Sequence, residues 1–261
     1  MDRSPHAQCS EPTRWGEITD FHRGGGARAQ SSTRAGPGLP SAPLLGWPTS
    51  IAMSGDTVGT MTRELITTAA DGIARCGWVS DDPEYRRYHD GEWGVPLHGD
   101  QALFETIALE GFQAGLSWIT ILRRRSAFRS AFDDFSIARV AQYDELKADE
   151  LSGDPTIIRN RQKILATIAN ARIVDNLISD DPGALDSLVW GHAPASHARP
   201  QTIDQVLSVT DESTALSASL RRLGLKFVGP TTMHALMQAA GLINDHAVGC
   251  ARGDELAAGR R

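Results

Sequence analysis

Cysteine and long apolar runs are both scarce in this chain. Three cysteines, Cys9, Cys76 and Cys250, are too few and too widely spaced for the disulfide framework of a small secreted protein. No stretch approaches the roughly 18 consecutive apolar residues that a membrane span needs, and the N-terminus shows no basic flank followed by an apolar core. These absences predict a soluble, cytoplasmic protein without a membrane partner.

An excess of basic residues is missing as well. The 261 residues include 26 Lys and Arg against 32 Asp and Glu, which gives a net charge of −6. A nucleic acid would therefore have to be bound by a local basic patch rather than by the whole surface. One candidate patch is the arginine group, which consists of Arg123, Arg124, Arg125 and Arg129. Its alternative is a solvated helix face.

Composition divides the chain into three parts. Residues 1–72 are rich in Gly, Pro, Ser and Ala without helical or strand periodicity, which predicts a disordered extension. A misassigned start is the alternative, because Met53 and Met61 both lie just ahead of the periodic part. Residues 73–252 show helical spacing and almost no strand-like alternation, so we expect one all-α domain there and a frayed tail over residues 253–261.

The longest amphipathic run, from Arg159 to Ile178, predicts a central helix. Capping and stop signals predict further helices. They begin after Asp100, after Ser117 and after Asp181 with Pro182, and the last two span Ser213–Leu223 and Pro230–Gly241.

Two pairs of metal-binding residue types lie at opposite ends of the periodic part. Cys76 and His89 form one pair, and His246 and Cys250 form the other, at the i, i+4 spacing of one helical turn. Together they make the Cys₂His₂ set that suits tetrahedral zinc, although the distance between the pairs excludes a contiguous zinc finger. The alternative is two ordinary histidines and two small buried cysteines.

Aromatic residues are concentrated between Cys76 and Trp118. Stacked rings of this kind bind nucleobases, especially positively charged ones, although core packing explains many tryptophans equally well. Glu110 follows an apolar helical stretch, where a carboxylate is either solvated or held to accept hydrogen bonds from a base edge. The aromatic residues are Trp78, Tyr85, Tyr88, Trp93 and Trp118.

Three segments resemble a known family. RCGWVSDDPEYRRYHDGEWGVPL, LFETIALEGFQAGLSWITILRRR and GLKFVGPTTMHALMQAAGLINDHAVGC are similar, in matching order, to the bacterial type I, constitutive 3-methyladenine DNA glycosylases. The resemblance covers residues 75–250. It implies an all-α helix-hairpin-helix glycosylase fold in which one structural zinc ion joins the two ends of the domain through Cys76, His89, His246 and Cys250.

The resemblance also implies the site and its reaction. A 3-methyladenine flipped out of double-stranded DNA would be recognised by Glu110 as the catalytic residue, stacked by Tyr88 and Trp118, and surrounded by Tyr85, Trp93 and Trp78. Hydrolysis would leave an abasic site, and no lyase step is expected, because Pro230, Thr231 and Thr232 follow the hairpin glycine where lyases carry a lysine.

Two alternatives and two departures from the family pattern stand beside this prediction. The alternatives are a non-catalytic protein that binds alkylation-damaged DNA and a zinc-stabilised helical interaction module. Phe112 occupies a position that is often Gln in the family, and Thr156 one that is usually Gly. We expect the protein to act as a monomer.

Overall fold

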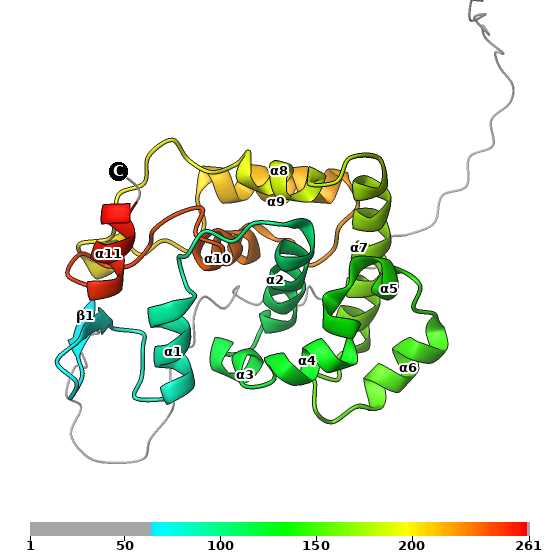
Figure 1. The fold of residues 1–261 in the computed structure, drawn as a ribbon, viewed down its shortest axis with the longest axis horizontal. Helices are drawn as coiled ribbons and strands as arrows, with labels where there is room; N and C mark the ends of the chain where they lie inside the picture. Colours follow the sequence, from blue (N-terminus) through cyan, green and yellow to red (C-terminus); the bar gives the residue numbers. More distant parts are fainter. Residues whose placement is uncertain (1–63, 260–261) are drawn as a thin grey trace, which may run out of the picture. The chain divides into compact units, whose positions relative to one another are not determined.

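The computed structural model describes residues 64–259, and Figure 1 shows how they are arranged. The described residues are mainly helical, as the sequence predicts, and a two-stranded antiparallel sheet with Ile66 opposite Cys76 precedes the helices. In chain order the elements are β1 (Ile66–Thr68), β2 (Ala74–Cys76), α1 (Pro83–Gly91), α2 (Asp100–Gln113), α3 (Trp118–Leu122), α4 (Arg125–Ala131), η1 (Asp133–Phe135), α5 (Ile137–Ala141), α6 (Glu145–Gly153), α7 (Arg161–Asp180), α8 (Ala184–Trp190), η2 (Ile203–Gln205), α9 (Asp211–Arg222), α10 (Pro230–Ala239) and α11 (Ala251–Gly259), where η marks a 3₁₀-helix.

Both predicted boundaries of the helical domain need correction. Residues 64–72, which the sequence-based prediction assigns to the extension, lie in and around the sheet, because β1 pairs with β2. Residues 253–259 belong to α11, where the sequence predicts a frayed tail. Gly253 of α11 is buried, and its carbonyl accepts a hydrogen bond from Asn244, a tertiary contact that no local pattern shows. Residues 1–63 and 260–261 of these predictions, including Met53 and Met61, lie outside the described residues.

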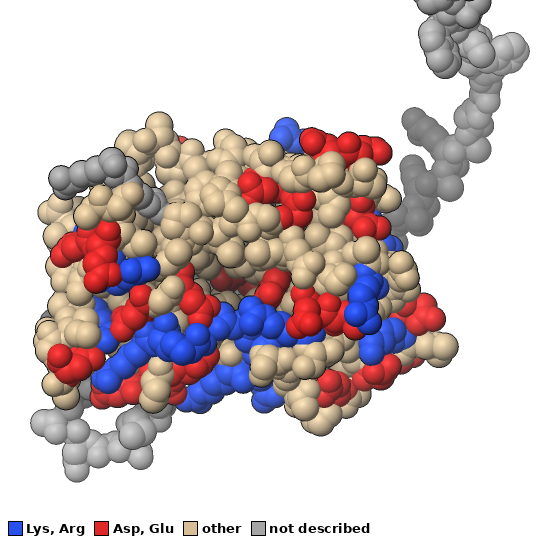
Figure 2. All heavy atoms as spheres, viewed as in Figure 1, with Lys and Arg blue, Asp and Glu red and all other residues tan. Residues whose placement is uncertain are grey.

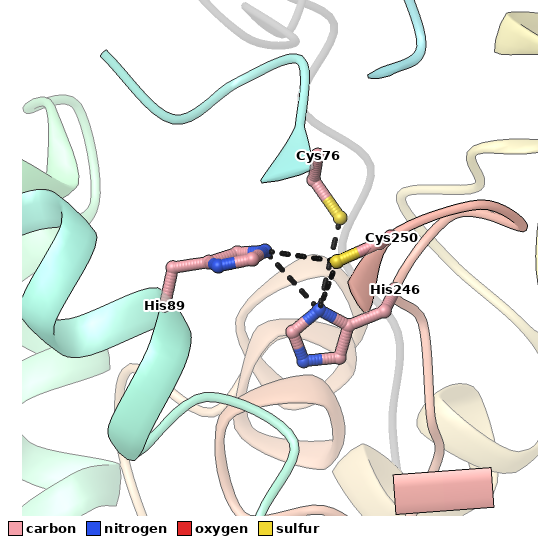
Figure 3. A group of neighbouring side chains, drawn as sticks. All are labelled: Cys76, His89, His246 and Cys250. Carbon is pink, nitrogen blue, oxygen red and sulfur yellow. Dashed lines mark hydrogen bonds between the residues drawn. The ribbon is translucent and has the colours of Figure 1, made fainter. Parts of the chain in front are cut away.

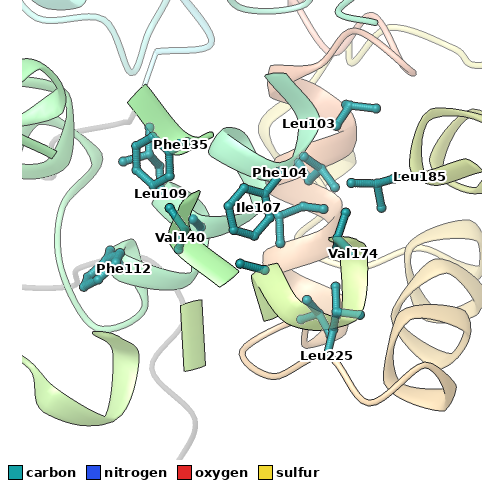
Figure 4. Close-up of a cluster of buried hydrophobic side chains, with 14 of the residues drawn as sticks. Leu103, Phe104, Ile107, Leu109, Phe112, Phe135, Val140, Val174, Leu185 and Leu225 are labelled. Carbon is teal, nitrogen blue, oxygen red and sulfur yellow. The ribbon is translucent and has the colours of Figure 1, made fainter. Parts of the chain in front are cut away.

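The core lies between α2, α7 and α8. Leu103 and Ile107 of α2 lie near Leu185 of α8 and Val174 of α7, and all four side chains are fully buried (Figure 4). Full burial of one such side chain contributes roughly 1.5–3 kcal/mol. The predicted central helix is confirmed as α7, which Asn160 caps by accepting from the backbone of Lys163. Nowhere in residues 64–259 is a helix both long enough and apolar enough to cross a membrane.

Two predicted helix caps act differently from the prediction. Asp100 does not cap its own helix α2; its carboxylate accepts from the backbone N–H groups of Gly183 and Asp186, at 2.7 and 3.0 Å. Asp181 ends α7 instead of opening α8, whose N-cap is Gly183 in the left-handed region. The Asp100 carboxylate thus caps a helix more than eighty residues away, which fixes α2 against α8.

Candidate functional site

The four predicted metal-binding side chains meet in one buried cluster (Figure 3). Cys76 ends β2, His89 lies on α1, and His246 and Cys250 lie just before α11. One ligand atom from each residue lies within 4.8 Å of all the others. The fold therefore brings together two pairs of residues that the sequence places at opposite ends of the domain, and the group could hold a metal ion.

The distances within this cluster fit a tetrahedral metal site with the bond lengths that zinc makes. Metal–sulfur and metal–nitrogen bonds of about 2.3 and 2.05 Å require S···N edges of about 3.6 Å and an N···N edge of about 3.3 Å. Cys250 Sγ lies 3.5 Å from His89 Nε2 and 3.4 Å from His246 Nδ1. Cys76 Sγ lies 3.7 Å from His246 Nδ1, and the two imidazole nitrogens are 3.2 Å apart. All four distances match the tetrahedral values to within about 0.2 Å.

Hydrogen bonds outside the cluster orient both imidazoles toward its centre. Asp90 lies 2.7 Å from His89 Nδ1, so that nitrogen donates to the carboxylate and Nε2 faces the cluster as an acceptor. His246 Nε2 lies 3.0 Å from the Trp93 carbonyl, so Nδ1 is the acceptor there. Two lone pairs 3.2 Å apart repel each other unless a cation lies between them. The donor set therefore fits a metal ion better than it fits a cluster of hydrogen bonds.

Two arginines, the buried Arg75 and the partly buried Arg199, hold the segments that carry these ligands. Arg75 donates to Asp90 through Nε at 2.9 Å and Nη2 at 2.7 Å, and so fixes the carboxylate that orients His89. Arg199 donates to the carbonyls of His246 and Ala247, at 2.8 and 2.6 Å. The Cys76 thiol, hydrogen-bonded to Cys250, lowers the pKa of Cys250 below its ordinary value and so favours the thiolate that a metal binds.

The five predicted base-binding aromatics divide into two sets within one apolar cluster. Trp78 and Trp93 pack on the metal-binding histidines: Trp78 lies 5.3 Å from the His89 ring and Trp93 lies 4.5 Å from the His246 ring, between centroids. Tyr85 contacts Trp78 edge-on. The second set consists of Tyr88 and Trp118, which we call the aromatic pair.

The aromatic pair joins α1 to the first residue of α3. Its ring centroids are 5.4 Å apart, with the planes tilted by 50°. Tyr88 is buried, and Trp118 packs against both apolar clusters of the domain. Tyr88 precedes His89 directly on α1, so one short helix carries a predicted base-stacking residue and a predicted metal ligand side by side.

Glu110 is buried on α2 with only 4% of its surface exposed, which decides against the solvated alternative. Burial raises its pKa to about 8, so the Glu110 carboxyl is mainly neutral at pH 7. Burial and the charge of Glu110 together raise the pKa of Tyr88, which places the carboxyl within electrostatic reach of the aromatic pair.

Two buried polar atoms of this site lack hydrogen-bond partners among the described residues. They are Glu110 Oε2, an acceptor when ionised, and Trp118 Nε1, a donor. Leaving such a group unpaired costs about 1–3 kcal/mol. A planar ligand with both donors and acceptors would relieve this cost, so the arrangement suits a nucleobase edge better than an apolar core.

Each member of the arginine group contacts other residues of the protein, although the side chains of Arg123 and Arg129 remain exposed. Arg123 pairs with Asp82, and Arg129 donates to Glu105 at 2.8 Å. Arg125 binds Glu92 through both terminal nitrogens, and Arg124 donates to the backbone carbonyls of residues 155 and 156. Figure 2 shows the basic side chains as a band over α1 and α4 with acidic side chains among them. The sequence pattern could not show these partners, because each lies 24 to 41 positions away.

Both departures from the family pattern have a local structural role. Phe112 is fully buried, with its ring 4.6 Å from that of Phe128, and so belongs to the core. Thr156 donates through its backbone and its hydroxyl to Asp154, which forms a turn without glycine. Neither substitution alters the aromatic pair or the metal cluster.

Sequence reasoning missed two buried polar residues on α7. Lys163 donates to the carbonyls that end α2, and Asn170 binds the backbone of Lys226 between α9 and α10. Both lie inside the amphipathic run, which the sequence-based prediction interprets from its apolar residues alone. A lysine and an asparagine on the core side of that spacing were the signal that could have found them.

A family model described as Methyladenine glycosylase matches residues 78–253 of this chain. DNA-3-methyladenine glycosylase 1 of Escherichia coli strain K12 is 46% identical over 181 residues, which cover 68% of this chain and 96% of that protein. DNA-3-methyladenine glycosylase of Haemophilus influenzae is 39% identical over 180 residues, which cover 67% of this chain and 96% of that protein.

Solved structures give the same result. A crystal structure of 3-methyladenine DNA glycosylase I is 42% identical and superposes with a TM-score of 0.65, covering 68% of this chain and 98% of the other. A structure of 3-methyladenine DNA glycosylase I from Staphylococcus aureus, described as the structural basis of 3-methyladenine recognition, is 34% identical with a TM-score of 0.63. The match covers 67% of this chain and 93% of the other. With this extent of similarity in sequence and fold, the chain belongs to the methyladenine glycosylase family.

Proposed function

We propose that this protein hydrolyses the N-glycosidic bond of 3-methyladenine in alkylated double-stranded DNA and leaves an abasic site. The observation that carries the proposal is the buried carboxyl of Glu110, which lacks a partner at Oε2 and lies in electrostatic reach of the aromatic pair. The names of the relatives and of the solved structures support it.

Recognition follows from the charge of the damaged base. A base methylated at N3 is cationic, and stacking between Tyr88 and Trp118 gains a cation–π contribution of about 0.5–2 kcal/mol. The positive charge favours the ionised form of Glu110, whose pKa of about 8 means that the carboxyl loses its proton as the base enters. Normal adenine is neutral and gains neither contribution.

Catalysis then needs little beyond recognition. The cationic base is already a good leaving group, because it departs as neutral 3-methyladenine, so a pocket that captures the flipped base for attack by water needs no strong acid. Extruding a base from the duplex costs a few kcal/mol, and the damaged base resists least. Water is the nucleophile, because Pro230 and Thr231 offer no amine for a Schiff base after the hairpin.

The DNA backbone would contact the segment between α9 and α10, residues 223–229, which we call the hairpin. Pro230 opens α10, whose first backbone N–H groups have no partner within the helix and suit a phosphate. We propose that this segment is the helix-hairpin-helix element of the family.

We propose zinc as the ion of the Cys₂His₂ cluster. Cys76, His89, His246 and Cys250 leave no open position in a tetrahedron, so the ion would stabilise the fold and take no part in cleavage. Metal analysis of the purified native protein tests this, with one zinc per chain expected.

The deciding experiment measures free base released from methylated duplex DNA. Wild type should release 3-methyladenine, and Glu110→Gln should remain folded but release it far more slowly. Phe112→Leu is the matched control, because it alters the core two residues away without touching the carboxyl. Tight binding of methylated DNA with no base release would support a non-catalytic damage-binding protein instead.

A further inference from the structure

The longest helix of the domain, α7, carries a buried polar stripe within its apolar face. Lys163, Thr167 and Asn170 follow the i, i+4, i+7 spacing of one helix face, and they are only 8%, 4% and 4% exposed. Polar side chains in this position are costly unless each has a partner. The partners of the outer two residues are the end of α2 and the hairpin.

Lys163 holds the end of the helix that carries Glu110. Its Nζ donates to the carbonyls of Phe112 at 2.8 Å and Ala114 at 2.6 Å, two acceptors that α2 leaves without helical partners. The positive charge also suits the negative end of the helix dipole. The turn that follows leads directly to Trp118, so Lys163 fixes the link between the carboxyl and one stacking ring.

Asn170 holds the hairpin through two hydrogen bonds to the backbone of one residue, Lys226. Its Nδ2 donates to the carbonyl of Lys226 at 3.0 Å, and its Oδ1 accepts from the backbone N–H of Lys226 at 2.8 Å. The next residue, Phe227, has a φ of +58°, which a residue other than glycine rarely adopts. The double hydrogen bond keeps the hairpin in that unusual conformation.

The two held loops also meet each other. A Cβ atom added to Gly111 would lie 3.4 Å from Phe227 Cβ, so the hairpin packs against α2 at the residue after Glu110. Ser217 of α9 adds a third restraint, because its hydroxyl donates to the Val228 carbonyl at 2.6 Å. Figure 1 shows α7 beside α2, and the two helices are in contact.

We propose that Lys163 and Asn170 are positioning residues that set the base site and the hairpin in fixed register on α7. A flipped nucleotide remains covalently joined to the DNA backbone that the hairpin would hold. The distance between the base site and the hairpin must therefore stay constant. A misplacement of about 1 Å is sufficient to lower the rate about 100-fold. The inference rests on the proposed function and assigns each end of the stripe a separate part of it.

The test compares three near-isosteric variants of the full chain: Lys163→Met, Thr167→Val and Asn170→Leu. The Thr167 hydroxyl donates only to the carbonyl of Lys163 within α7, so Thr167→Val removes a buried hydrogen bond of the same stripe without releasing either loop. The measurements are free 3-methyladenine binding, binding to undamaged duplex over a range of salt concentrations, single-turnover base release, and thermal unfolding.

We expect the variants at the two ends of the stripe to lose function in different assays. Lys163→Met should weaken free-base binding about tenfold and base release about 100-fold, with duplex binding unchanged. Asn170→Leu should weaken duplex binding about tenfold and lower the salt slope by about one unit, with free-base binding unchanged. Thr167→Val should lower the unfolding temperature and leave all three functional values within about twofold of wild type.

Two further variants keep the test decisive if a variant does not fold. Ser217→Ala releases the hairpin from the other side and should reproduce the Asn170→Leu result. Lys163→Arg retains donors and charge and should keep part of the free-base binding. If all variants lose only stability, with function per folded molecule equal to wild type, the stripe is merely structural and the inference is wrong. If wild type itself binds neither 3-methyladenine nor duplex, the proposed function fails instead.

Discussion

The candidate metal cluster and the aromatic pair of the proposed base site lie within the same apolar cluster, but the two sites differ in how their polar atoms are satisfied. Around the metal cluster, Asp90 and the Trp93 carbonyl accept from the two histidines, and Arg75 and Arg199 hold the surrounding backbone and carboxylate. In the base site, Glu110 Oε2 and Trp118 Nε1 have no hydrogen-bond partner among the described residues. A complete outer network is typical of a group that stabilises the fold, whereas unpaired buried atoms are typical of a group that binds a ligand.

Removing the metal should produce the largest effect on stability. Cys250→Ser, or a strong chelator, should lower the free energy of unfolding by several kcal/mol, because the binding energy of a structural metal is folding energy. Thermal unfolding with and without chelator measures this. Base release per folded molecule at low temperature should stay near the wild-type value. A large fall in that value at full folding would show that the metal also supports the base site.

Glu110→Gln should have the opposite pattern of effects, with activity lost and stability gained. We expect base release to fall about 10²-fold or more, because a preorganised charge is lost, while the fold becomes more stable. Thermal unfolding and base release on one preparation give both values. A variant that is both less stable and fully active would contradict the contrast between the two sites.

The stability gain of Glu110→Gln should depend on pH. The folded-state pKa of about 8 lies above the ordinary value of 4.5, so the folded protein binds this proton more tightly than the unfolded chain does. The stability that the neutral carboxyl contributes is present below pH 4.5 and is lost as pH rises toward 8. The difference in unfolding temperature between variant and wild type should therefore widen over that range, and a constant difference would be evidence against the raised pKa.

The same titration predicts a pH profile for wild-type activity. Cleavage of the cationic lesion at low substrate concentration should rise with pH and level off above about 8, because the carboxylate is the form that attracts the base. Glu110→Gln should lack this rise. Equal profiles for the two proteins would assign the titration to another group.

The smallest effect is expected at the arginine group. Asp82 pairs with Arg123 and also caps α1, a role that asparagine can take over. Asp82→Asn should therefore release Arg123 and strengthen duplex binding a few-fold, with the salt slope rising by at most about one unit. Arg123→Ala should remove this gain when the two changes are combined. No change in salt dependence for either variant would show that Arg123 does not contact DNA.

Periodicity predicted the elements whose stabilisation is local. The central helix and the start of α10 at Pro230 follow from apolar spacing and from the fixed φ of proline, and the structure confirms both. Asp100 shows where prediction from local pattern fails. Its carboxylate caps α8 instead of its own helix, and α8 comes close to Asp100 only in the folded chain. The end of the domain shows it again, because α11 depends on contacts with Arg199 and Asn244.

The site was predictable to a different degree. Spacing alone identified the four candidate ligands but left zinc and ordinary core residues both open, and only the family resemblance favoured a metal at the residues that the fold brings together. The resemblance also named the aromatic residues, but not that Trp78 and Trp93 pack on the metal-binding histidines. Lys163 and Asn170 went unpredicted because their partners are backbone atoms about fifty positions away, which have no signature in a sequence.

The separation of the metal-binding residues has a consequence for how the protein is made. Cys76 and His246 are 170 positions apart, so the first half of the cluster leaves the ribosome long before the second. Metal capture with all four ligands must wait until α1 to α10 have been synthesised. In the cell, a filled cluster would therefore mark a domain whose synthesis has reached Cys250, and chains released early would lack this protection against proteases.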